Sequence, residues 1–210
     1  MAAPRTAARA RRRAELGPRL LGAVEALLAG GTSYTELTVD ELLAAAGVAR
    51  STFYKTFEGK GDLLVTWLEQ IIEEIEDSAD AWWSLGGDAG PDELRAALVT
   101  AAAAYAPHAT VMSAAYEVAP FDPAVRAEMS DLVARGIGGL RRHIKRGQRE
   151  GWVDPEVPAD EAATWIVAMQ ERAFQQLRRL GDEHDLDRLM RAQADVIWHA
   201  LYAHAPARAA

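Results

Sequence analysis

Residues 50–60, RSTFYKTFEGK, bring together side chain types that contact nucleic acids. An arginine can donate two hydrogen bonds to guanine O6 and N7, and a threonine methyl group can touch a thymine methyl group. Hydroxyl and ammonium groups commonly bind phosphate oxygens. The segment predicts contact with double-stranded DNA. The residues expected to contact base edges are Arg50, Ser51 and Thr52, and those expected to contact phosphates are Tyr54, Lys55 and Lys60.

These side chains need a second helix and a tight turn to position them. Residues 38–57 read TVDELLAAAGVARSTFYKTF, in which Thr38 and Glu41 have capping-box spacing and Gly47 provides a turn. A following helix from Arg50 to Phe57 completes a helix-turn-helix, whose second helix can enter a major groove. Thr38, at a helix N-terminus that attracts anions, is a further candidate for phosphate contact.

The remaining sequence predicts an all-α fold of about nine helices. Apolar residues recur at helical spacing, Gly and Pro separate the segments, and no convincing alternation typical of strands occurs. We expect an N-terminal three-helix domain that contains the helix-turn-helix, followed by a helical domain. The expected helices outside the motif cover residues 15–29, 60–79, 91–105, 108–118, 123–149, 158–180 and 185–203.

Charge divides the chain unevenly. Residues 1–60 contain nine Arg and Lys against six Asp and Glu, whereas residues 61–210 contain 14 against 25. A basic end on an acidic body favours a focused contact with phosphates rather than general nucleic-acid affinity. We therefore divide the chain into a flexible basic arm (1–14), a DNA-binding domain (15–60) and a body (61–210). Whether the arm contacts DNA or only aids solubility stays open.

The body is rich in aromatic and polarizable side chains, as a site for a small apolar molecule requires. Such side chains at helical spacing also form ordinary hydrophobic cores, so a ligand site and a plain core both stay open. Glycines 136, 138 and 139 lie inside an expected helix, where they either admit a neighbouring helix or leave room for a ligand. The candidate ligand-binding residues are Trp67, Leu98, Tyr105, Tyr116, Trp165, Met169, Gln170, Phe174 and Trp198.

Several functional classes find no support in the sequence. No nucleophile elbow, phosphate-binding loop or dinucleotide fingerprint occurs, so we expect neither an enzyme nor a cofactor. The chain has no cysteine, which fits a cytoplasmic location, and the arginines at the N-terminus are not followed by the apolar segment of a secretory signal. The alanine-rich stretch 96–116 is broken by Pro107, which argues against a membrane span. We expect the acidic run 182–187 to place negative charge at the start of a helix rather than to bind a metal.

The helix-turn-helix resembles that of the TetR family of bacterial transcriptional regulators over about residues 15–68. The resemblance lies in a Thr cap, an acidic helix, an Ala-Gly-Val turn, a Thr-aromatic-Tyr recognition helix ending in Phe, and a Lys that opens the next helix. Ala49, Thr56 and Glu58 depart from this pattern. The second half more faintly resembles the branch with the ethionamide-activation repressor. The corresponding residues are Thr38, Asp40-Glu41, Ala46-Gly47-Val48, Thr52-Phe53-Tyr54, Phe57 and Lys60, and, in the second half, MQERAF (169–174), Ile197-Trp198 and Leu201-Tyr202.

This resemblance implies a homodimer that pairs through its last two helices and binds a palindromic operator. It also implies a helical domain for ligand binding and dimerisation. The protein would then be a repressor that releases DNA when it binds a small apolar effector. Two other classes stay open: an all-α small-molecule-binding protein or enzyme with a vestigial helix-turn-helix, and a protein-interaction scaffold. DNA binding distinguishes the regulator from both.

Overall fold

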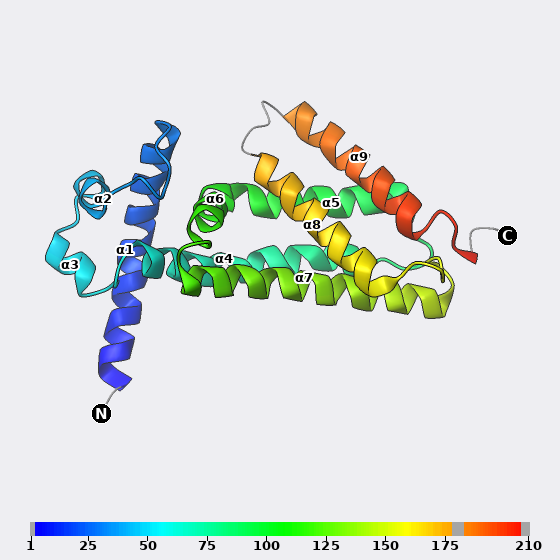
Figure 1. Ribbon diagram of the computed structural model, residues 1–210, viewed down its shortest axis with the longest axis horizontal. Helices are drawn as coiled ribbons and strands as arrows, with labels where there is room; N and C mark the ends of the chain where they lie inside the picture. The colour runs from blue at the N-terminus through cyan, green and yellow to red at the C-terminus, as the bar shows by residue number, and fades with distance from the viewer. Residues whose placement is uncertain (1–2, 178–182, 207–210) are drawn as a thin grey trace. The chain divides into compact units, whose positions relative to one another are not determined.

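The computed structural model describes residues 3–177 and 183–206, and the regular secondary structure in these ranges is helical (Figure 1). The all-α prediction is confirmed. The elements are α1 (Ala3–Ala29), α2 (Val39–Ala46), α3 (Arg50–Tyr54), α4 (Lys60–Trp83), α5 (Pro91–Tyr105), η1 (Ala106–His108), α6 (Ala109–Val118), α7 (Pro123–Glu150), α8 (Ala159–Leu177) and α9 (Glu183–Leu201).

Helix α1 differs most from the prediction, because it begins at Ala3 rather than near Glu15. The arm sequence contains alanine and arginine, both strong helix formers. Tertiary contacts reinforce this propensity, since Arg9 and Arg13 both donate to the carboxylate of Asp62 at the start of α4. Helix α3 is shorter than expected and ends at Tyr54, while α4 continues past residue 79 to Trp83. Residues 178–180 of the expected 158–180 helix lie outside the described residues.

The chain forms two compact units that do not follow a simple division at residue 60. The first contains the chain up to Ile71 together with Thr110–Ser130, and the second contains Ile72–Ala109 with the chain from Asp131 onward. Helices α4 and α7 therefore each contribute to both units. The functional assignment of residues 15–60 and 61–210 stays a prediction.

In the first unit, α1 packs against α2, and α2 leads directly into α3 (Figure 1). The turn between α6 and α7 also belongs to this unit. Asp122 in that turn accepts hydrogen bonds from the backbone amides of Ala124 and Val125, and so caps the start of α7. A side chain at Gly61 of α4 would collide with the Asp122 carboxylate, so this glycine allows the turn to approach α4 closely.

The second unit is built around one apolar core to which α4, α5, α7, α8 and α9 contribute. Helix α9 packs on both α5 and α8. Of the three glycines singled out on α7, Gly139 touches the Trp83 ring so closely that any side chain would clash with it. Gly139 thus serves the close approach of α4 and α7. The buried residues of this core include Trp82, Leu94, Leu98, Leu140, Ile144, Trp152, Ala163, Met190 and Ile197.

A buried polar network fixes the end of α4 in the second unit. The Nδ1 atom of His143 donates to the Trp83 carbonyl over 3.2 Å, since a carbonyl can only accept. Its Nε2 atom then accepts from the Tyr202 hydroxyl over 2.8 Å, and that oxygen accepts from the Trp82 indole over 2.9 Å. Arg146 donates to the carbonyls of Trp83 and Leu85. His143 is therefore a structural residue with both ring nitrogens hydrogen-bonded.

This network predicts a stability that decreases in acid. Burial lowers the pKa of His143 to about 4, from 6.5 in the unfolded chain. Between these values the unfolded chain takes up a proton that the folded chain does not, so the unfolding free energy should fall by up to about 3 kcal/mol as the pH decreases from 6.5 to 4. Urea unfolding of wild type and His143→Gln across this range measures it. Parallel pH profiles of the two proteins would contradict the assignment.

Candidate nucleic-acid interface and candidate effector core

Local sequence signals position the two helices of the motif. The Thr38 hydroxyl accepts from the Glu41 amide over 3.2 Å, while the Glu41 carboxylate accepts from the Thr38 amide over 2.8 Å, which completes the predicted capping box. Gly47 ends α2 in the left-handed conformation, with φ of 62°, and its amide donates to Ala44. Ala49 offers no side-chain cap to α3. The turn therefore depends on Gly47 and on the packing of α3.

Two phenylalanines anchor α3 and the residues that follow it. Phe53 and Phe57 are both fully buried, with ring centroids 5.4 Å apart. Phe53 is the buried residue of α3, so the other side chains of this short helix project outward. The exposed set coincides with most of the predicted DNA contacts: Arg50, Ser51, Thr52, Tyr54 and Lys55.

Arg50 is exposed but has partners within the same unit. Its guanidinium pairs with the carboxylate of Asp40 in α2 and lies over the Tyr54 ring, 5.4 Å from the ring centroid. Both contacts orient the guanidinium on the outer surface of the motif. The Asp40 carboxylate also offsets part of the charge that Arg50 would present to DNA.

Lys60 faces the interior of the first unit, unlike the exposed residues 50–52, 54 and 55. Its ammonium donates to the carbonyls of Tyr34, Thr35 and Leu37 and lies 5.3 Å from the centroid of the Tyr34 ring. Partial burial lowers the pKa of Lys60, while nearby Glu117 and Glu41 oppose this change. These contacts favour a structural role, in which Lys60 ties the loop before α2 to the start of α4.

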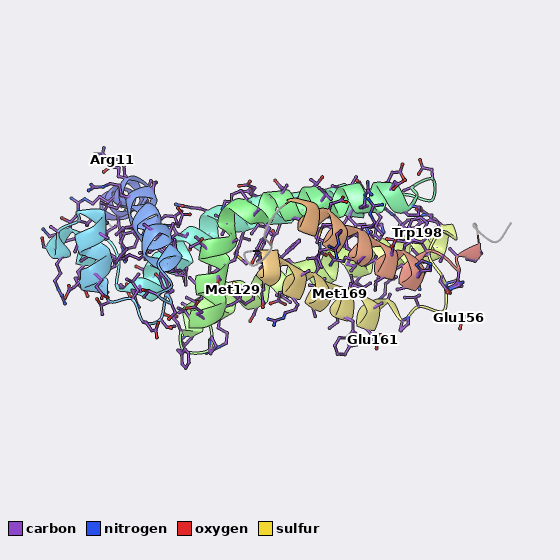
Figure 2. The ribbon with its side chains drawn as sticks, turned by 90° about the horizontal axis from the view of Figure 1, so that it is seen from above. Arg11, Met129, Glu156, Glu161, Met169 and Trp198 are labelled. Atoms are coloured by element: carbon purple, nitrogen blue, oxygen red, sulfur yellow. The ribbon has the colours of Figure 1, made fainter. Side chains whose placement is uncertain are left out.

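Other candidate phosphate ligands are also engaged internally. The Thr38 amide and hydroxyl both donate to Glu41, so a phosphate would have to compete with that carboxylate. Arg13 donates to both oxygens of Asp62 over 2.6 and 2.7 Å, and Arg9 reaches the same carboxylate over 3.2 Å. Arg11 lies on the outer side of α1, where it pairs with Glu15 (Figure 2). The arginines of α1 whose side chains the structure describes thus divide between internal ion pairs and the exposed surface.

The candidate ligand-binding residues do not form one cluster. Trp67 and Tyr116 belong to the first unit, where the buried Trp67 indole donates to the Gly17 carbonyl. Trp165 of α8 is 75% exposed and lines no interior space of the single chain. Within the second unit, the rings of Tyr105 and Phe174 stack with centroids 4.8 Å apart. The buried or half-buried candidates of that unit are Leu98, Tyr105, Met169, Gln170, Phe174 and Trp198.

One small cavity in the second unit lies between the loop after α4, the start of α5, and the C-terminal parts of α7 and α9 with the residues that follow them. Its volume of about 10 Å³ suits a single water molecule. Trp198 is the predicted ligand-binding residue that lines it; Figure 2 marks this residue on α9 and Met169 on α8. The lining consists of Leu85, Gly86, Ala89, Leu94, His143, Trp152, Trp198 and Tyr202.

Both parts of the chain match models of one family. Residues 23–66 match the model of bacterial regulatory proteins of the tetR family, and residues 90–193 match the Tetracyclin repressor-like C-terminal domain. The chain belongs to the TetR family.

Individual TetR-family proteins resemble the chain at low identity. The HTH-type transcriptional regulator EthR of Mycolicibacterium smegmatis is 26% identical over 152 residues, which cover 71% of this chain and 68% of EthR. The crystal structure of PfmR from Thermus thermophilus has a TM-score of 0.69 at 20% identity and covers 87% of this chain and 97% of its own. A putative regulator of Saccharomonospora viridis in complex with choline has a TM-score of 0.67 at 20% identity, covering 90% and 98%. These structures support the shared fold.

The TetR-family pattern accounts for the motif but not for all polar residues of the second unit. Sequence reasoning missed Gln193, which is buried on α9. Its spacing from Met190 and Ile197 would have placed it on the apolar face. Among the described residues no cluster suits a metal ion, and no helix is long and apolar enough to cross a bilayer. The acidic run 182–187 lies largely outside the described side chains.

The contrast between Lys60 and Lys55 provides a test of the interface. Replacing Lys60 with Met should lower the unfolding free energy by about 1–3 kcal/mol, because the carbonyls of Tyr34 and Leu37 lose their donor. The dependence of DNA affinity on salt should stay unchanged. Lys55→Met should leave stability nearly unaltered and lower the slope of log affinity against log salt by about 1. Urea unfolding and DNA titrations at several salt concentrations measure both effects. A reduced slope in a stable Lys60→Met variant would assign Lys60 to DNA.

Proposed function

We propose that this TetR-family regulator is a repressor that binds a palindromic operator as a homodimer and releases it when a small apolar effector enters the second unit. The observation that carries the DNA-binding part is the exposed surface of α3, where Phe53 alone is buried and the polar side chains project outward. In a helix-turn-helix the N-terminal residues of the second helix meet base edges. Arg50 and Thr52 occupy that position.

The Asp40–Arg50 pair orients the Arg50 guanidinium on the exposed surface of α3 before DNA binds. Stacking on Tyr54 restricts the guanidinium further. A bidentate contact to guanine requires a planar guanidinium held in the groove, and each such contact contributes about 1–3 kcal/mol of discrimination. Ordering the side chain before binding reduces the entropy lost on binding.

Helix α4 provides the path from effector to reading surface in this proposal. Its first turn carries Lys60 and Asp62, which hold the loop before α2 and the arginines of α1. Its last residue, Trp83, is fixed in the second unit by His143 and Arg146. An effector that binds one arrangement of the second unit more tightly can shift the position of α4. The free energy of this shift cannot exceed the difference in the effector's affinity for the two arrangements.

Helix α6 also contacts the loop before α2. The Glu117 carboxylate accepts from the backbone amides of Tyr34 over 2.9 Å and Thr35 over 3.4 Å. These amides belong to the same loop whose carbonyls bind Lys60. Movement of either α4 or α6 would therefore act on the segment that leads into α2.

Base reading is tested by alanine substitution of Arg50 and Thr52. Each substitution should weaken operator binding by about 1–3 kcal/mol and relax the sequence preference at one position of each half-site. Gel shifts with DNA flanking the protein's own gene measure the affinity. Arg149→Ala, which removes an exposed arginine of α7, is the charge-matched control and should bind normally. An unchanged sequence preference in Arg50→Ala would remove Arg50 from the reading set.

Dimerisation through α8 and α9 is supported by two exposed apolar side chains. Trp165 of α8 is 75% exposed and Val196 of α9 is 56% exposed, although α8 and α9 pack on each other (Figure 1). A two-fold axis beside this pair would bury both residues in a four-helix bundle. Large aromatic side chains contribute strongly when such a surface is covered.

Replacing both Trp165 and Val196 with serine should convert a dimer to a monomer at micromolar concentration. A two-fold symmetric interface contains both copies of each residue, so each substitution removes two apolar side chains from it. Sedimentation velocity measures the change. Phe121→Ser removes a side chain that is 82% exposed in the first unit, and this control should stay dimeric. A double variant that sediments like wild type would exclude this surface as the interface.

A further inference from the structure

Gln193, on α9 of the second unit, is a buried polar residue whose side-chain amide makes no hydrogen bond within the described residues. It is 5% exposed, and neither its amide oxygen nor its amide nitrogen has a hydrogen-bond partner in the part of the chain that the structure describes. It shares one face of α9 with buried apolar residues at helical spacing, namely Met190, Ala194, Ile197 and Leu201. Gln193 thus lies on the apolar face of α9.

Other polar groups of this unit are better paired. The Nε atom of Arg146 also has no partner among the described residues, but its guanidinium donates to two carbonyls through another nitrogen. Both ring nitrogens of the buried His143 have partners. The Gln148 amide, on α7, donates to the carbonyls of Asp154 over 3.2 Å and Val157 over 2.8 Å. An unpaired buried amide costs free energy that an apolar side chain of similar size would not. Gln193 therefore lowers the stability of the chain unless another molecule completes its hydrogen bonds.

We propose that Gln193 recognises the effector, and that the effector is an uncharged, mainly apolar molecule with a carboxamide, lactam or imide group. This inference rests on the effector-responsive function proposed above. The Gln193 carbonyl would accept from the effector N–H, and its NH₂ group would donate to the effector carbonyl. Such a two-point contact needs a donor and an acceptor side by side, which an amide has and an ester lacks.

The surroundings of Gln193 favour a neutral ligand. Among the described residues of the second unit, the buried polar side chains are Gln193 and His143, and His143 is neutral at pH 7. A carboxylate or ammonium group beside Gln193 would lose its hydration, and the neutral amide of Gln193 could not balance its charge. An uncharged amide loses less, and Gln193 can replace both of its hydrogen bonds to water.

The helices that meet α9 can accommodate the apolar part of such a molecule. Helix α5 contributes the small buried residues Ala97, Ala101 and Ala102 to the unit, and it packs directly on α9. Met190 of α9 and the half-buried Met169 of α8 are unbranched. Methionine changes rotamer at little cost, so these side chains can move aside when a ligand enters.

The experiment compares matched amides and esters on the full-length protein. The probes are four primary amides, from phenylacetamide to 5-phenylpentanamide, each with the methyl ester of the same acid. Calorimetric titration gives the dissociation constants. For at least one chain length we expect the amide to bind wild type ~10-fold more tightly than its ester, the discrimination expected when a buried polar group is left unpaired by the wrong ligand. Equal affinities in every pair, or no binding by any probe, would overturn the proposal.

Two variants identify the residue responsible. Gln193→Met should abolish the amide preference and should melt at the same temperature as wild type or above it, because it removes an unpaired polar group. Gln148→Met, the matched control, should melt lower and keep the preference, because its amide has internal partners. Retention of the preference in Gln193→Met would assign recognition to another residue.

The gel shift separates this inference from the proposed function. Wild type that binds its operator, but shows no amide preference, would refute the role of Gln193 and leave the DNA-binding function intact. An amide preference without any operator binding would refute the regulator and leave the recognition by Gln193 standing.

Discussion

The ionic contacts at the first turn of α4 hold the DNA-binding part of this molecule together. Lys60 donates to the carbonyls of the loop before α2, and two residues later Asp62 accepts from Arg9 and Arg13 of α1. Asp62 also accepts from the amide of Glu58. One helical turn therefore fixes α1, the loop and α3 relative to α4. A small three-helix domain buries little apolar surface, so such contacts matter more to it than to a larger core.

The same arrangement engages part of the basic N-terminus in contacts within the first unit. Arg13 is largely enclosed, lies 5.5 Å from the centroid of the Phe57 ring and donates to Thr66 and Asp62. Its charge is used to extend α1 and to orient it against α4. The net charge of residues 1–60 predicts attraction to phosphates, but the exposed arginines and lysines decide where that attraction acts.

Short-range patterns in the sequence predicted the parts of the fold that depend on neighbouring residues. The Thr38–Glu41 cap, the left-handed Gly47 and the start of α5 at Pro91 each need only a few consecutive residues. Side-chain partners far apart in the sequence were not predictable in this way. Nothing near Lys60 indicates that its ammonium turns inward, because the carbonyls that bind it lie more than twenty residues earlier.

Two tryptophans show that the sequence was equally unable to predict long-range packing in the candidate effector core. Trp67 and Trp165 both lie on apolar stripes of long helices, yet one is 2% exposed and the other 75%. Helical periodicity reports that a face avoids water, and a core, a ligand site and a subunit interface all satisfy that condition. Polar residues on such a face are more informative, because each must find a partner. Gln193 has the spacing of a core residue and the chemistry of a recognition group, and only the structure reveals that its hydrogen bonds are unfilled. Among the described residues of the second unit, this amide therefore indicates a ligand more specifically than the aromatic residues around it do.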